Sequence, residues 1–432
     1  MNVEAVPEVP PANLFTPRFG YSPHQIVGRD VLLNELAAAL RSPRRKKHST
    51  TLVMGPRGAG KTVMLNAVEA QAAALGYAIV SVDAGTPGVH ERIVSRVERV
   101  ADTLPALTAT AEADEVRTSS GLRLGPFRAG RERRYVMSRK PDVRDALEDL
   151  ADAMVASGGA GVLITIDEMH RVDIDEMIRL ANDLQHVSSR DEAPVVFVGA
   201  SLPDIKNVLN DDRLSFFRRC ADEDLAGLDA ADAYAFISGT VKDAGGDYDQ
   251  EALRRLTVNV GPLPYEMQLL GDYAWRFAGA PLRPVGDEAV DMALRATADE
   301  MHRKVYAPLW ERLTGDERNV LIAVTDNDGS VARTDLGQIL QGAVRDPDPI
   351  VRRLVHKACL EADEFDILTL GPALSLSAAR HETRISTSYH SGHSYVAAAA
   401  ASLPRCGKLM PRAKRRCVLR RGHRGGCRSQ IK

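Results

Sequence analysis

A glycine-rich octapeptide in the first quarter of the 432-residue sequence has the composition of a phosphate-binding loop. Glycines let the backbone curl until successive N–H groups face phosphate oxygens, and the positive end of a following helix strengthens the attraction. In this pattern, G-x-x-x-x-G-K-[ST], the lysine contacts the β- and γ-phosphates and the hydroxyl binds Mg²⁺. The eight residues are Gly55, Pro56, Arg57, Gly58, Ala59, Gly60, Lys61 and Thr62. They predict a site for ATP and Mg²⁺.

Two adjacent acids would supply the second half of such a site. Asp167 and Glu168 follow the apolar run at 162–166, which is typical of a buried strand. Asp167 would hold the water shell of Mg²⁺, and Glu168 would orient or deprotonate the water that attacks the γ-phosphate. The alternative is a pair of solvated acids at a strand end. The sequence Asp-Glu-Met-His also matches one helicase motif, but we see no other, and we interpret His170 as a helix-start or packing residue.

Two further positions are candidates for the same chemistry. Ser201 ends the apolar run VVFVGAS, and a small hydroxyl beside the strand of Asp167 would sense the γ-phosphate or the attacking water. A helix N-cap is the alternative for this serine. Arg218 and Arg219 follow an aromatic pair, and a cation there would neutralise transition-state charge on a neighbouring subunit's nucleotide. A salt-bridged surface pair is the alternative for the arginines.

Short apolar runs that alternate with amphipathic segments surround these motifs. The runs are rich in Val and Ile, as in strands buried on both faces, and the segments between them have helical periodicity. An α/β fold with a parallel sheet covered by helices is therefore predicted. The predicted strands are 50–55, 78–83, 162–166 and 194–201, and the predicted helices are 29–41, 61–75 and 173–187. We assign no element to residues 105–141.

The predicted strands stop after residue 228. Residues 229–300 have the periodicity of consecutive helices, and a smaller unit follows from about residue 305 to 380. Its three helices and two-stranded ribbon resemble a winged helix-turn-helix. The helices are predicted at 316–325, 333–341 and 348–361, and the ribbon at 366–370 and 373–378.

The composition is that of an ordinary globular protein. Hydrophobic residues make up 44% and charged residues 26%, which excludes collagen-like, mucin-like and wholly disordered chains. No apolar run reaches the roughly 18 residues that cross a bilayer, and the N-terminus is acidic and proline-rich, unlike a secretory signal. We therefore expect a cytoplasmic protein without a membrane partner.

The net charge is −2, but residues 405–432 contain 11 Lys and Arg and no Asp or Glu. Any electrostatic attraction to nucleic acid is therefore expected to be local to this tail.

The basic tail also contains side chains that suit Zn²⁺. Cys406, Cys417, His423 and Cys427 form C-x10-C-x5-H-x3-C, and thiolates with imidazole bind Zn²⁺ tetrahedrally. A short basic segment without an apolar core would fold only with such a metal. The spacing lacks a CxxC pair, and a disordered basic arm is the alternative. Either form would attract nucleic acid in a salt-dependent manner.

These motifs, in this order, resemble the AAA+/STAND class of P-loop ATPases, in particular the subgroup with an origin-recognition-like, archaeal-ATPase-like domain and a C-terminal winged helix. The likeness covers roughly residues 15–300. The likeness rests on the glycine-rich loop and the two acids. It also rests on four further segments: Ile26–Asp30, VGAS at 198–201, SFFRR at 215–219 and Pro264–Gln268. The resemblance implies a P-loop NTPase sheet followed by a helical lid. It also implies that Val27, Gly28 and Pro264 flank the adenine and that Arg219, at the SxxxR position, is an arginine finger.

The lid sequence departs from this class in two ways. The class carries a lid arginine that contacts the nucleotide. The corresponding stretch here has no arginine before Arg276, near its end, and we do not assign a nucleotide contact to Arg276. The expected Gly-x-Pro spacing is also shifted, because Pro262 stands where glycine is expected and Gly261 precedes it. Both departures favour a slow ATPase that holds nucleotide between lid and core.

The expected organisation is an extended arm, an AAA+-like ATPase domain, a helical lid, a winged-helix domain, and a linker with the basic Cys/His tail. The predicted ranges are 1–22, 23–228, 229–302, 303–380 and 381–432. The predicted function is an ATP-hydrolysing switch that forms nucleotide-dependent homo-oligomers and acts on double-stranded DNA in replication, transposition or regulation. The alternative is a STAND-type signalling or defence ATPase whose output is self-association.

Basic side chains near the predicted recognition helix favour contact between the winged helix and DNA. They are Arg345, Arg352, Arg353 and Lys357, and five acids surround the same helix, namely Asp346, Asp348, Glu361, Asp363 and Glu364. A winged helix used for packing or for protein contact is therefore the alternative.

Overall fold

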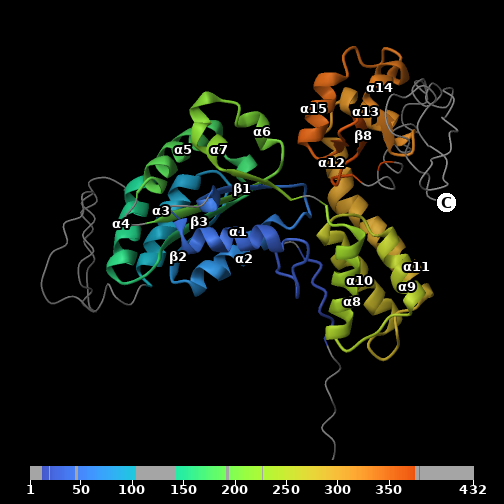
Figure 1. The fold of residues 1–432 in the computed structure, drawn as a ribbon, viewed down its shortest axis with the longest axis horizontal. Coiled ribbons are helices and arrows are strands. Elements are labelled where there is room, and N and C mark those ends of the chain that lie inside the picture. The colour runs from blue at the N-terminus through green and yellow to red at the C-terminus, as the bar shows by residue number, and fades with distance from the viewer. Residues whose placement is uncertain are drawn as a thin grey trace, which may run out of the picture.

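The computed structural model of the chain describes residues 12–379, except residues 19, 44–46, 104–141, 191–193, 226 and 375–378. Figure 1 shows three groups of elements: a sheet with helices on both faces, a helical bundle, and a smaller unit of helices and short strands. The unassigned segment 105–141 and the predicted zinc ligands of the tail lie outside the described residues. Among the helices that the structure describes, none combines the length and hydropathy that crossing a bilayer requires.

Five parallel strands form the central sheet in the order β2-β3-β4-β1-β5. They are β1 (Thr50–Met54), β2 (Tyr77–Asp83), β3 (Gly161–Asp167), β4 (Val195–Ser201) and β5 (Ala221–Asp224). Met54 pairs with Ser201, and Asp83 pairs with Asp167, so the carboxyl ends of these strands lie side by side and form the carboxyl edge of the sheet. The predicted α/β fold with a parallel sheet is confirmed.

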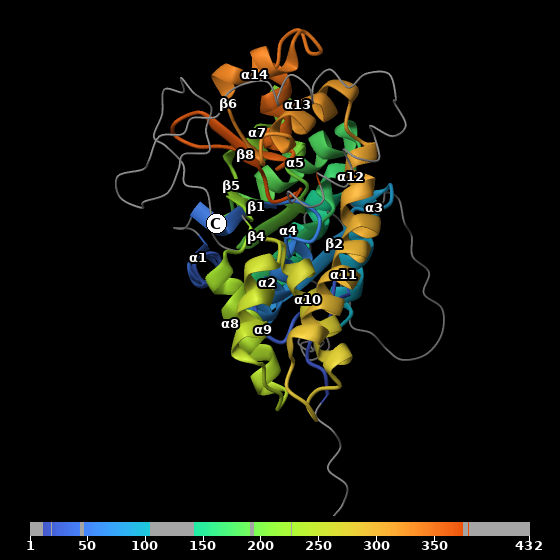
Figure 2. The ribbon, with the colours of Figure 1, turned by 90° about the vertical axis from the view of Figure 1, so that its right-hand side faces the viewer.

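Helices cover both faces of this sheet (Figures 1 and 2). On one face lie α1 (Asp30–Arg41) and α2 (Lys61–Ala74), and on the other lie α3 (Val89–Ala101), α4 (Val143–Ala156), α5 (Ile174–Ser188) and α7 (Ser215–Arg219). Leu36 and Val68 are fully buried on the first face, and Leu147 and Leu184 are fully buried on the second. The short segments between them are η2 (Lys47–Ser49), η4 (Met169–Arg171), α6 (Ile205–Val208) and η5 (Asp212–Leu214).

The sequence does not predict the edge strand β5. Its residues Ala-Asp-Glu-Asp contain no apolar run, and Asp222 and Asp224 are both exposed and pair with Lys206 at 3.5 and 2.8 Å. A strand at the edge of a sheet hydrogen-bonds to one neighbour and leaves side chains in solvent. Hydrophobic periodicity therefore gives no signal for it.

A bundle of helices follows the sheet and forms the lid. It consists of α8 (Ala230–Asp243), α9 (Gln250–Asn259), α10 (Pro264–Ala278) and α11 (Asp287–Met301). Phe15 from the N-terminal segment is buried in this bundle, and its ring meets that of Phe236 edge-on with centroids 5.9 Å apart. Gly271 makes room for it, since a Cβ at this position would collide with the Phe15 ring. The described part of the predicted arm, residues 12–22, contains no helix or strand but packs on the lid.

The last group of elements is a winged helix, joined to the lid by the π-helical segment η6 (His302–Tyr306) and by α12 (Ala307–Glu311). Its strands pair antiparallel in the order β6-β8-β7. Its elements are α13 (Gly315–Thr325), β6 (Ser330–Ala332), α14 (Arg333–Leu340), α15 (Asp348–His356), β7 (Leu360–Ala362) and β8 (Ile367–Leu370). Its core is continuous with the lid, because Leu263 and Tyr265 pack in the same cluster as Trp310 and Leu354.

Two predictions for the winged helix are wrong in detail. The helix predicted at 348–361 ends at His356, because Ala358 has a left-handed φ of 55° that cannot continue a helix. The residues after it form β7, which pairs with β8. The ribbon therefore pairs β7 with β8, which coincides with the predicted strand 366–370, whereas Ala373 and Leu374 lie in a turn and residues 375–378 lie outside the described residues.

A buried carboxylate ties α13 to α15. Glu317 is 1% exposed and accepts bonds from Lys357 Nζ at 2.8 and 2.9 Å and from the backbone N–H of Thr314 at 2.8 Å. Burial acts to raise the pKa of Glu317, but the bonds from Lys357 and Thr314 outweigh it, so the pKa lies below the usual range. A depressed folded pKa means that this stabilisation is present above the pKa of an unfolded glutamate and is lost as pH falls through the folded value.

We predict that Glu317→Ala lowers the free energy of unfolding of the winged helix by about 3 kcal/mol, because it leaves the Lys357 ammonium half-buried without its counter-charge. Urea unfolding followed by Trp310 fluorescence in a Trp275→Phe background measures the loss. Asp316→Asn, which changes an exposed acid one residue away, is the matched control. Equal stability of Glu317→Ala and the control would contradict the prediction.

Candidate functional site

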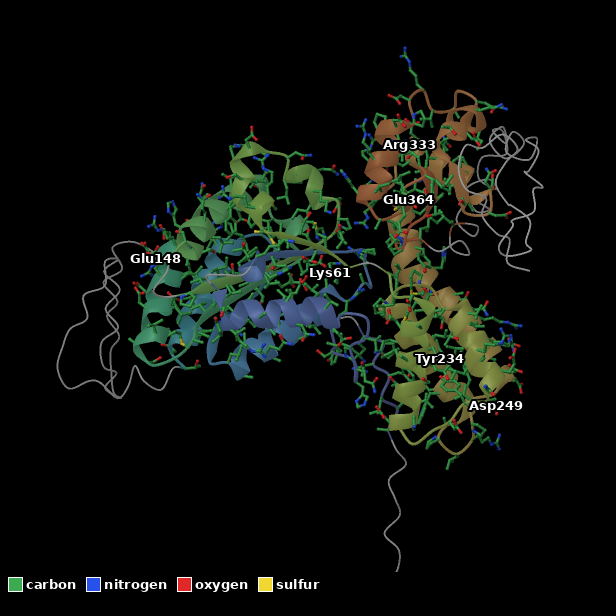
Figure 3. The ribbon with its side chains drawn as sticks, in the orientation of Figure 1. Lys61, Glu148, Tyr234, Asp249, Arg333 and Glu364 are labelled. Carbon is green, nitrogen blue, oxygen red and sulfur yellow. The ribbon has the colours of Figure 1, made fainter. Side chains whose placement is uncertain are left out.

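The glycine-rich loop joins β1 to α2 at the carboxyl edge of the sheet, and Figure 3 shows Lys61 at the end of the sheet that faces the lid and winged helix. Gly58 and Gly60 have φ of 83° and 92°, in the left-handed region that favours glycine. A Cβ at Gly58 would lie 3.1 Å from Tyr265 Cβ, and the N–H of Tyr265 donates to Gly58 O at 3.2 Å. The loop is therefore curled against the first turn of α10, and the N-terminus of α2 adds its positive dipole end.

Lys61 is the buried cation of this loop. It is 7% exposed, and its ammonium donates to Gly55 O and Pro56 O, each at 3.0 Å. Burial lowers the pKa of Lys61 below its ordinary value, while the carboxylates of Glu168 and Asp167 act against this shift. The structure thus holds the lysine between the backbone of the loop and the two acids that the sequence singles out.

The two halves of the predicted Mg²⁺ site meet directly. Thr62 Oγ1 donates to Asp167 Oδ2 at 2.6 Å, and Asp167 Oδ1 accepts the backbone N–H of Glu168 at 2.8 Å. A hydroxyl and a carboxylate are hard oxygen donors of the kind that Mg²⁺ takes in nucleotide sites. The residues present therefore fit the metal.

Glu168 is held beside the site by the imidazole of His170 and the guanidinium of Arg171. It has a left-handed φ of 56°, and its Oε2 lies 3.3 Å from His170 Nε2 and 3.2 Å from Arg171 Nε. His170 also accepts the N–H of Leu202 at 3.4 Å, and its burial lowers its pKa. His170, interpreted from the sequence as a helix-start or packing residue, thus links Glu168 to the loop that follows β4.

Ser201 lies at the carboxyl end of β4 next to the glycine-rich loop. Its carbonyl accepts the N–H of Gly55 at 3.3 Å, and the residue is fully buried. Its hydroxyl has no hydrogen-bond partner among the residues that the structure describes, so it does not cap a helix there. A buried hydroxyl of this kind needs a partner. Ser201 does not itself line the cavity described next.

A cavity of about 450 Å³ lies between the loop, the N-terminal segment and the lid, which is within the size range of ligand pockets. The predicted adenine contacts Val27 and Pro264 line it, together with residues 57–62 and Glu168. Gly28 does not line it. Instead, a Cβ at Gly28 would lie 2.6 Å from Leu228 Cδ2, so this glycine permits close approach to the lid.

Sequence reasoning missed several residues that line this cavity. They are Thr16, Arg18, Gly20, Tyr21, Arg29, Tyr265 and Lys304. The N-terminal ones belong to a proline-rich segment without periodicity, and Lys304 lies at the boundary between the predicted lid and winged helix. Arg29 and Tyr265 lie in the motif segments Ile26–Asp30 and Pro264–Gln268, but the motifs assign them no role. For the others the sequence contains no motif, because folding alone brings them to the loop.

Other predicted cations lie outside this cavity. Arg219 Nη2 donates to Gln185 Oε1 at 2.9 Å, and Arg218 pairs with Asp212 at 3.1 Å. Both arginines are exposed and neither lines the cavity of its own chain. Arg276, to which the sequence assigns no role, pairs with Asp272 and lies over the Tyr273 ring, also away from the cavity.

The basic side chains predicted on the winged helix divide into two sets. Lys357 and Arg353 pair with the buried Glu317, at 2.8 and 3.4 Å. Arg345 and Arg352 are exposed. Two of the four charges are therefore partly neutralised within the fold.

One further cluster has metal-compatible donors. The ligand atoms of Glu35, His48 and Glu223 lie within 4.8 Å of one another. His48 Nε2 lies 3.1 Å from Glu35 and 2.8 Å from Glu223, and Lys47 reaches Glu223 at 3.8 Å. Ion pairs that tie α1 to β5 account for this arrangement.

Comparison with known proteins agrees with this fold. Residues 25–198 match the AAA ATPase domain family. No curated protein sequence matches the chain. Among solved structures, the Walker-type ATPase PABY2304 of Pyrococcus abyssi is 12% identical with a TM-score of 0.60, covering 85% of this chain and 99% of that one. The ORC2 protein of Aeropyrum pernix, in ADPNP-ADP complexes, is 14% identical with a TM-score of 0.56, covering 86% and 98%.

Residues 25–198 thus match the family that the motifs resemble. The structural likeness extends beyond this domain to most of each chain, so the lid and the winged helix belong to the shared architecture. At these identities the likeness defines the fold and does not assign a substrate or a partner.

Proposed function

We propose that this chain is a molecular switch that binds ATP with Mg²⁺ and hydrolyses it to ADP and phosphate. The observation that carries the proposal is the bond between Thr62 and Asp167, which joins the phosphate loop to the acidic strand end beside the buried Lys61. The orphaned hydroxyl of Ser201 at the same edge supports it. The shifted lid proline and the missing lid arginine favour slow turnover.

The residues divide the work of phosphoryl transfer to water. The backbone N–H groups of the loop and Lys61 would hold the β- and γ-phosphates. Thr62 and Asp167 would hold Mg²⁺, which supplies positive charge to the phosphate oxygens when it is bound. Water attacks the γ-phosphorus as the bond to the bridging oxygen breaks, and ADP leaves with that oxygen. Glu168 accepts the proton of the attacking water, and Ser201 orients the water or the γ-phosphate.

The pairs that Glu168 makes with His170 and Arg171 bear on this role. The carboxylate must turn from these two partners to reach a water at the γ-phosphate. This arrangement supports a switch that keeps ATP for some time before hydrolysis.

We predict that Glu168→Gln retains ATP and loses turnover by at least about a hundredfold, because the amide fills the same space but cannot accept the proton. Equilibrium binding of radiolabelled ATP and release of phosphate are the two measurements. Glu176→Gln, a change of the same kind at the first turn of α5, should leave both intact. Full turnover in Glu168→Gln would remove the glutamate from the reaction.

Assembly into a homo-oligomer forms part of the proposal, with Arg219 reaching the nucleotide of a neighbouring subunit. The exposed position of Arg219 at the end of α7, outside its own cavity, supports such a role in a neighbour's site. The STAND-type alternative also depends on this self-association.

We predict that Arg219→Ala lowers turnover by about a hundredfold and that mixing it with Glu168→Gln restores part of the activity. In the mixture, the intact Arg219 of one variant meets the intact Glu168 of the other. Phosphate release at several protein concentrations measures this, and Arg218→Ala is the matched control. A monomeric Arg219→Ala with full activity would end the finger assignment.

DNA is the second candidate partner, and the winged-helix fold together with exposed Arg345 and Arg352 favours it. We predict that the chain shifts the fluorescence anisotropy of a labelled duplex at about 50 mM salt. The double variant Arg345→Ala/Arg352→Ala should reduce the slope of log affinity against log salt by about two. An unchanged slope would remove the winged helix from the contact, and nucleotide-dependent assembly without DNA binding would favour the STAND-type alternative.

A further inference from the structure

A lysine that no motif identifies lines the nucleotide cavity from the side of the lid. Lys304 lies in the π-helical segment η6, which leads from α11 into the winged helix. Such segments interrupt regular helices and occur often at functional sites. Two neighbouring cations of the lid side are committed elsewhere: Arg276 pairs with Asp272, and Arg303 donates to the carbonyl of Asp299.

Tyr265 places Lys304 close to the phosphate loop. The backbone N–H of Tyr265 donates to Gly58 O at 3.2 Å, in the middle of the loop, and its phenol oxygen lies 3.5 Å from Lys304 Nζ. One residue therefore spans the distance between the loop and this lysine. Tyr265 and Lys304 both line the same cavity as Lys61.

The next residue shows which end of the loop η6 approaches. Val305 lines a smaller cavity of about 130 Å³ together with Pro56, Arg57 and the loop Leu202–Asp204 that follows Ser201. That loop is the continuation of the strand whose end holds the orphaned Ser201 hydroxyl. Lys304 thus belongs to the segment that approaches Pro56 and Arg57 of the phosphate loop and the loop after Ser201.

The present partner of Lys304 is exchangeable. Its ammonium donates to Glu300 Oε1 at 2.5 Å, and the side chain remains 49% exposed. Tyr273 donates to the other oxygen of Glu300 at 2.6 Å, so Glu300 keeps a partner when the lysine moves. A terminal phosphate carries more charge than one carboxylate and competes for the same ammonium.

We propose that Lys304 contacts the terminal phosphate of ATP and makes this site prefer ATP over ADP. The inference rests on the proposed function and adds the residue that distinguishes the two nucleotides. The segment also connects to the winged helix, because Val305 packs in the winged-helix core, while Tyr306 donates to Glu266 of the lid helix α10 at 3.2 Å. Loss of the terminal phosphate would release η6 from the loop.

The test is the affinity of the full chain for ADP and for the β,γ-imido analogue of ATP, measured by calorimetry with Mg²⁺. Lys304→Ala should weaken the analogue about tenfold and ADP less than about twofold, as expected for one charge-assisted bond to the terminal phosphate. Lys304→Arg should keep the preference. Arg303→Ala, which removes the neighbouring exposed cation, should change neither affinity.

A second variant separates phosphate contact from the Glu300 pair. Glu300→Gln breaks the ion pair and leaves the ammonium in place, so the preference should be kept or increased. Equal losses for both nucleotides in Lys304→Ala, or the same loss in Glu300→Gln, would overturn the assignment while leaving ATP binding intact. Absence of nucleotide binding in the unaltered chain would overturn the proposed function itself.

Discussion

The parallel register of β1, β3 and β4 is the constraint on which the site depends. Because all three strands run in the same direction, the loop after Met54, the acids after Ile166 and the hydroxyl of Ser201 emerge at the same edge. Separate stretches of sequence, far apart along the chain, thereby become one set of donors and acceptors. The bond between Thr62 and Asp167 is the direct product of this register, and no local interaction in either segment would create it.

A second constraint couples this edge to the rest of the chain. The N-terminus of α10 hydrogen-bonds to the phosphate loop at Gly58, and the next turns of the same helix hold the N-terminal segment through Phe15 and Gly271. Tyr265 belongs to the same apolar cluster as the winged helix. The phosphate loop, the lid and the winged helix are thus in packed contact, which is the physical connection that the proposed switch would use.

The sequence predicts the parts of this fold whose signal is local. Apolar runs reveal β1 to β4, and the spacing of Gly55, Gly60, Lys61 and Thr62 is enough to define the loop. The edge strand β5 and the end of α15 escape prediction, because a solvated strand has no apolar period and the stop at Ala358 depends on a single backbone angle. The cavity wall formed by residues 12–22 and the position of Lys304 depend on tertiary packing alone. The pairs that hold Glu168 are local, but they depend on its left-handed backbone, which the sequence pattern does not predict.

The most direct test of the central claim is a crystal structure of the chain with Mg²⁺ and a non-hydrolysable ATP analogue. The account predicts β- and γ-phosphates on the backbone N–H groups of residues 57–62, with the metal beside Thr62 and Asp167 and a γ-phosphate oxygen or a water at Ser201. Nucleotide bound elsewhere, or phosphates in this loop with a metal remote from Asp167, would contradict it.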